Sequence, residues 1–160
     1  APIGITVEGS NTLTRSLIVF GQGLNKSHPY IFPILDSILN GDVKSFKNNF
    51  NLMLGHSLRL YFKSYNPARN LKQQIVNFAC LTNFVALKGG LLKKEQMLSG
   101  DMADIFSNLY LALSVDYYHK NNNASKKLTD HIIYHLLDEN QSIMNRVIGN
   151  LGKERFLLSH

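Results

Sequence analysis

Cysteine is almost missing from this sequence, with one residue, Cys80, among 160. A single cysteine cannot form an internal disulfide, which excludes the small secreted domains that depend on a disulfide framework. Cys80 lies in an apolar segment, and no basic neighbour is spaced to activate it. We therefore expect a buried, unreactive thiol.

Long hydrophobic runs are also missing. No apolar stretch approaches the roughly 18 residues that suggest a membrane span. The first residues lack the basic region and apolar core of a signal peptide. We expect a cytoplasmic protein, and peripheral contact with the inner membrane remains open. The chain has no initiating Met, which suggests a piece of a longer protein.

The sequence lacks the motifs of several binding functions. The formal net charge of +6 favours acidic partners in general. However, there is no zinc-finger or RNA-recognition signature, and the lysines are scattered, so no nucleic-acid partner is predicted. Gly89-Gly90 with its nearby lysines does not match the phosphate-binding loop pattern.

What the sequence does contain is helical periodicity. No useful β-alternation follows residue 8, and apolar residues recur every three to four positions. The predicted fold is all-α, a bundle of about six helices with a short extended N-terminal lead-in. The expected helices cover approximately residues 12–20, 30–38, 43–65, 68–88 and 101–119, with a sixth capped by Ser125.

Turn residues separate these segments. Asn40-Gly41, Asn66-Pro67 and Gly89-Gly90 each end a helix, and Asp42 is expected to cap the next one. Short loops between helices predict antiparallel neighbours.

Glu8-Gly9 is the first candidate for chemistry. A carboxylate before a glycine turn is most often an ordinary surface feature. Alternatively, it is a general base: the glycine lets the backbone approach a ligand closely, and an apolar site would raise the pKa of Glu8 toward the useful range.

The residues around Glu8 resemble acyl-CoA dehydrogenases, which carry a Glu-Gly-Thr/Ser/Ala-Asn motif followed by an arginine. Here the segment runs Glu8-Gly9-Ser10-Asn11 to Arg15. It is most similar to the large bacterial fatty-acid oxidation type with an extended C-terminal region. Four further matches follow in order, at residues 21–23 (Gly-Gln-Gly), 28–30 (His-Pro-Tyr), 89–93 (Gly-Gly-Leu-Leu-Lys) and 103–112. The resemblance covers roughly residues 3 to 118.

The resemblance implies an FAD-dependent enzyme that oxidises fatty acyl-CoA to trans-2-enoyl-CoA in β-oxidation. Glu8 matches the base that removes the α-proton, while Ser10 and Thr12 match positions that contact FAD. Relatives often have an aromatic residue at the position of Val7 and threonine at the position of Ser10. Some place the base on an upstream helix.

The resemblance also divides the chain. Residues 1–23 would form the catalytic-base loop and following helix, and residues 24–160 a helical C-terminal extension, together one compact unit. The flavin-binding domains lie upstream in the family, so we expect this chain alone to be inactive and not to hold FAD. Implied partners are acyl-CoA, those upstream domains, an electron-transferring flavoprotein and further copies of the enzyme.

Two weaker candidates remain. His131, His135 and Glu139 share a helix face, but no metalloenzyme signature surrounds them, so no metal is predicted. The basic stretch around Leu91-Leu92 is usually a solvated face, and its alternative is contact with an anionic membrane surface. Its lysines are Lys88, Lys93 and Lys94, with Lys126 and Lys127 further on. A non-catalytic helical module for oligomerisation or membrane docking is the alternative function.

Overall fold

The computed structural model describes residues 28–66, 68–86, 96–122 and 124–151. These residues form five α-helices and no strand, which confirms the all-α class within the described chain. The helices are α3 (Ile31–Leu39), α4 (Val43–Ser64), α5 (Leu71–Ala86), α6 (Gln96–Asn122) and α7 (Lys126–Asn150). The helix expected near residues 12–20 and the extended lead-in lie outside the described residues.

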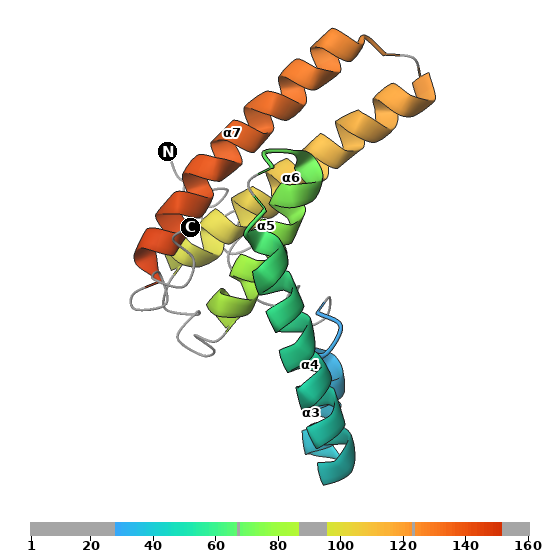
Figure 1. Cartoon of the computed structure of the whole chain (residues 1–160), viewed down its shortest axis with the longest axis vertical. Helices are drawn as coiled ribbons and strands as arrows, with labels where there is room; N and C mark the ends of the chain where they lie inside the picture. Colours follow the sequence, from blue (N-terminus) through green and yellow to red (C-terminus); the bar gives the residue numbers. More distant parts are fainter. Residues whose placement is uncertain (1–27, 67, 87–95, 123, 152–160) are drawn as a thin grey trace, which may run out of the picture.

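The helices are arranged in two parts (Figure 1). The two longest, α6 and α7, run antiparallel, and α5 packs against both, forming a bundle. The shorter pair, α3 and α4, forms a hairpin that projects away from the bundle; we call it the arm. The arm contacts the bundle where α4 packs against α5, and the chain reverses direction between these two helices after Tyr65.

The core lies between α5, α6 and α7. Its buried side chains recur mostly every three to four residues along each helix, as expected for helices packed on one side. Half-buried residues of α4 cover one edge of this core. The least exposed core residues, each at most 1%, are Cys80, Val85, Met102, Ile105, Ala112, Val147 and Leu151. Burial of this set is what stabilises the bundle.

The predicted stop signals hold in the arm. Gly41 has φ +66°, a backbone conformation that glycine adopts at little cost, and it ends the turn after α3. The Asp42 carboxylate accepts hydrogen bonds from the backbone N–H groups of Lys44 and Ser45, so it caps α4 as expected.

Three predicted boundaries were wrong. Helix α5 begins at Leu71 rather than near Ala68. Helix α6 begins at Gln96 rather than near Asp101, because Leu98 and Met102 both pack into the core and Gly100 is carried within the helix. It also continues through Asn122, where the side-chain amides of Asn121 and Asn122 donate to carbonyls four residues earlier. Core packing outweighs the turn preference of these residues.

Candidate functional site

The predicted substrate and flavin residues, Glu8, Ser10 and Thr12, lie outside the described residues, as do Arg15 and the Gly-Gln-Gly segment. Their roles therefore stay predictions. The first described part of the resemblance is His28-Pro29-Tyr30, at the start of the arm.

His28 joins the arm to the bundle. Its Nδ1 accepts hydrogen bonds from the backbone N–H groups of Tyr30 (3.2 Å) and Ile31 (3.3 Å), at the beginning of α3. Its Nε2 lies 3.2 Å from the side-chain carbonyl oxygen of Asn83 in α5. The His56 ring of α4 lies edge-on to both His28 and Tyr30, with centroid distances of 6.1 and 5.5 Å.

These contacts define the chemical state of His28. A ring nitrogen that accepts two N–H groups must be unprotonated, so the hydrogen is on Nε2 and donates to Asn83. Burial lowers the pKa of His28, and the nearby His56 lowers it further, against the opposing effect of Asn83. Both nitrogens are occupied, so this histidine anchors α3 and has no free nitrogen for acid–base chemistry.

We predict that lowering the pH weakens this anchor. Because the pKa of His28 is lower in the folded chain than in the unfolded one, the unfolded chain binds the proton more tightly. The stabilisation is complete above about pH 6.5 and is lost as the pH falls through the folded pKa, by up to about 1.4 kcal/mol per pH unit. Urea unfolding of the chain and of His28→Gln at several pH values measures it. Equal pH slopes for the two proteins would contradict the assignment.

The 103–112 block is a core segment of α6. Its side chains alternate between the bundle interior and the surface, as a helix packed on one side requires. The buried members are Ala103, Ile105, Leu109 and Ala112, whereas Phe106, Tyr110 and Leu111 are exposed. The block therefore contributes packing to the bundle.

An ion pair joins the ends of α6 and α7. The Arg146 guanidinium donates twice to the Asp101 carboxylate, at 2.6 and 2.9 Å, in a bidentate arrangement. Sequence reasoning missed this pair, because 45 residues separate its members. It fixes the end of the α6–α7 hairpin opposite the loop that joins the two helices.

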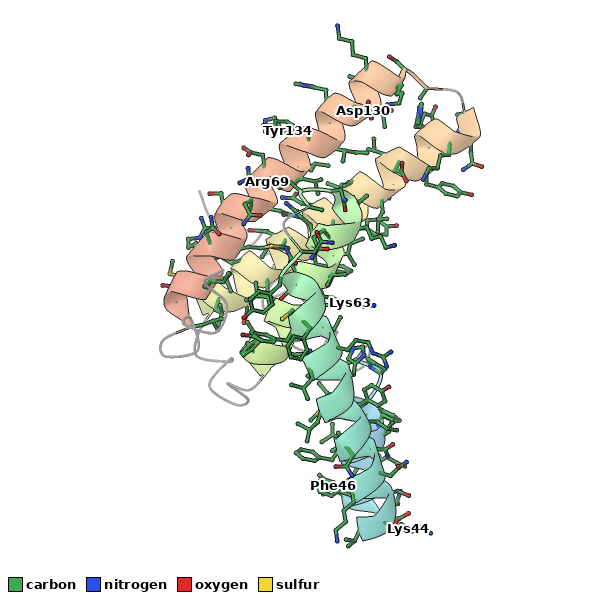
Figure 2. All side chains as sticks on the ribbon, in the orientation of Figure 1. Lys44, Phe46, Lys63, Arg69, Asp130 and Tyr134 are labelled. Carbon is green, nitrogen blue, oxygen red and sulfur yellow. The ribbon has the colours of Figure 1, made fainter. Side chains whose placement is uncertain are left out.

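The described residues offer no group of three or more histidine, cysteine, aspartate or glutamate side chains that could hold a metal ion. His131, His135 and Glu139 all lie on the exposed side of α7. Lys88, Lys93 and Lys94 lie outside the described residues, and Lys126 pairs with Asp130 at 2.9 Å. Figure 2 shows Asp130 near the loop end of α7.

Cys80 is 1% exposed, as its apolar neighbours predicted. Desolvation raises the pKa of its thiol, although a hydrogen bond with Ser64 acts in the opposite direction. A raised pKa leaves little thiolate at neutral pH, so the prediction of a buried thiol is confirmed and its chemistry agrees with an unreactive one.

An open groove lies where the beginning of α5 meets α6 and α7. Apolar side chains line most of the groove, and Lys72 and Asp116 are its charged lining residues. Lys72 is the one cation of this lining, and Asp116 pairs with Lys120 at 2.6 Å. The lining therefore offers a pyrophosphate no cluster of positive charges, and the groove does not fit FAD. Its lining residues are Asn70, Leu71, Lys72, Ile75, Leu113, Asp116 and Ile133.

The fold defines a helical domain whose bundle, α5 to α7, is its principal packed unit. Residues 63–159 match the family model described as acyl-CoA dehydrogenase, C-terminal, bacterial type. The match covers more than half of the chain, which therefore belongs to this family. It extends from the last turn of α4 through all three bundle helices. No solved structure matches the chain.

The matched region and the Glu8 segment are separate. The family match begins at residue 63, well after Glu8. It therefore supports the resemblance but does not test the role of Glu8 as the general base. It also includes residues 119–159, which lie beyond the last sequence block that carries the resemblance, residues 103–112. No described helix has the length and hydropathy that crossing a membrane requires.

Proposed function

We propose that this chain is the C-terminal part of an FAD-dependent acyl-CoA dehydrogenase that oxidises fatty acyl-CoA to trans-2-enoyl-CoA. The observation that carries the proposal is the family match over residues 63–159. The Glu8-Gly9-Ser10-Asn11 motif upstream of it supplies the candidate chemistry.

In this proposal the Glu8 carboxylate takes the α-proton of the acyl thioester. Bound FAD supplies the acceptor for the hydride that leaves the β-carbon. Glu8 must therefore be held within hydrogen-bond reach of the α-carbon's proton, in a site from which water is excluded. Ser10 and Thr12 are proposed to contact the flavin, and upstream domains of the same protein to provide most of its site.

The bundle and arm have a supporting role in this enzyme. The second candidate, a non-catalytic module for oligomerisation or membrane docking, is favoured by the many exposed apolar side chains of α4 and α6. We propose a cytoplasmic homo-oligomer that passes electrons to an electron-transferring flavoprotein, with the apolar face of α6 available to the upstream domains.

The proposal predicts that activity needs both parts of the protein. The isolated chain should purify without flavin, whereas the full-length enzyme should contain FAD and exchange the α-protons of an acyl-CoA with deuterated solvent. Absorbance spectra measure the flavin, and mass spectrometry of the recovered acyl-CoA measures the exchange. A stoichiometrically flavinated isolated chain would overturn the first expectation. A full-length enzyme that neither exchanges nor oxidises acyl-CoA would overturn the proposed function.

A further inference from the structure

Helix α4 exposes an apolar stripe from Phe50 to Phe62. Four large side chains follow one another at intervals of four residues, which places neighbouring members on the same side of a helix. Their exposed fractions increase from 39% at Phe50 through 46% at Leu54 and 58% at Leu58 to 71% at Phe62. The stripe continues at the tip of the arm, where Val43 is 63% exposed.

Another side of α4 is already occupied. Asn49 donates to the Ser37 hydroxyl of α3, and Leu60 packs against the core of the bundle. Tyr61 also packs there, and because it lies seven residues after Leu54 it borders the stripe. In Figure 2, α3 lies behind α4, and Lys44 and Lys63 extend on the side of α4 away from Phe46. Within α4, the Phe50 ring stacks on Phe46 and the Phe62 ring contacts Tyr61. The described residues nevertheless leave between 39% and 71% of each stripe side chain exposed.

Charge around the stripe has one sign. No aspartate or glutamate occurs between Val43 and Lys94. Every lysine and arginine of α4 is exposed, and none forms an ion pair with another described residue. They are Lys44, Lys47, Arg59 and Lys63. Of the arm's two acids, Asp42 already accepts hydrogen bonds from Ser45 and the backbone, which leaves Asp36 as the other.

The exposed apolar side chains of α6 are of another kind. Three of the seven are tyrosines, and the helix carries three acids, Asp101, Asp104 and Asp116. Tyrosine, with its polar hydroxyl, is enriched at protein interfaces. Helix α4 instead combines leucine and phenylalanine with lysine and arginine only, which is the composition of a helix that lies in a membrane interface.

We propose that α4 docks the protein on an anionic membrane surface, lying in the plane of the headgroups. Leu54, Leu58 and Phe62 enter the boundary with the acyl chains, and the four basic side chains reach the lipid phosphates. The 22-residue helix would present about 33 Å of contact along the surface. This assigns membrane contact to the arm, in place of the 88–94 segment that the sequence suggested.

Flotation of the complete chain with vesicles tests the proposal. We expect it to float with phosphatidylcholine vesicles containing phosphatidylglycerol, to stay behind with phosphatidylcholine alone, and to dissociate at high salt. Replacement of both Leu58 and Phe62 by glutamine should lower partitioning about ten-fold or more. Neutralising Lys44 and Lys47 as glutamine should lower it about five-fold for each charge.

A matched control is available on α7. Leu128 and Tyr134 are 59% and 70% exposed, nearly the same as Leu58 and Phe62, and their replacement by glutamine should leave flotation unchanged. Circular dichroism verifies that each variant keeps its helices. Absence of flotation with anionic vesicles, or an equal loss in the control, would overturn the proposal. So would sedimentation data in which the α4 variants dissociate an oligomer while flotation is unchanged, since the stripe would then bind a second copy.

Discussion

Replacing Glu8 by glutamine in the full-length enzyme is expected to lower turnover by about 10²- to 10⁴-fold, the usual contribution of a positioned general base. Glutamine has the size of glutamate but cannot accept a proton from carbon. The same substitution should abolish exchange of the α-proton with solvent. FAD content should not change, because the variant keeps Ser10 and Thr12.

Three measurements make this prediction specific. Steady-state kinetics give the turnover, deuterium incorporation into the acyl-CoA gives proton abstraction, and the visible spectrum gives flavin occupancy. Glu139→Gln is the matched control, because Glu139 is an exposed residue of α7. A Glu8→Gln enzyme that retains full activity would place the base elsewhere and favour the non-catalytic module.

Ile105→Ala is expected to destabilise the chain by about 2–5 kcal/mol, the range for removing a large aliphatic side chain from a packed core. Ile105 is 0% exposed and lies midway along the buried side of α6. Its removal leaves a cavity between α6 and α7 that neighbouring side chains can fill only in part.

The control for Ile105 is on the same helix. Leu111 has the same number of carbon atoms and is 50% exposed, so Leu111→Ala should cost much less, about 1 kcal/mol or below. Urea unfolding followed by circular dichroism measures both. Similar losses in the two variants would show that the bundle core is not where the structure places it.

The sequence predicted the helices of the described chain because its signals there are local. Periodic apolar residues and the Asp42 cap placed α3 and α4 to within a residue or two. It misplaced the start of α6, where burial of Leu98 extends the helix past Gly100. It could not show that Leu58 and Phe62 are 58% and 71% exposed. Periodicity identifies the apolar side of a helix, but it does not show how much of that side the neighbouring helices cover.

The candidate site also combines residues that the sequence identified and contacts that it could not. Glu8, Ser10 and Thr12 were identified from a motif, which requires knowledge of related sequences, and their roles stay predictions. The link between His28 and Asn83 joins residues 55 positions apart, and no spacing rule could find it. Such contacts follow only from the three-dimensional packing of α3 on α4 and of α4 on α5.

Two buried amides have a consequence for how α7 is seated. Gln74 of α5 donates to the Leu137 carbonyl at 2.6 Å, and Asn140 of α7 donates to the Ile105 carbonyl at 3.4 Å. Each amide oxygen is buried without a partner among the described residues, so the pair is not optimal for stability.

What the amides contribute is discrimination between alignments. Leucine and valine contacts would tolerate a slide of α7 by one turn, about 5.4 Å, because one apolar layer can replace another. A slide of that size would also carry the Asn140 amide, which is 0% exposed, out of the position built around it and away from the Ile105 carbonyl. The buried amide therefore favours the observed register of α7 against α6, in the way that a single buried polar residue fixes the register of packed helices.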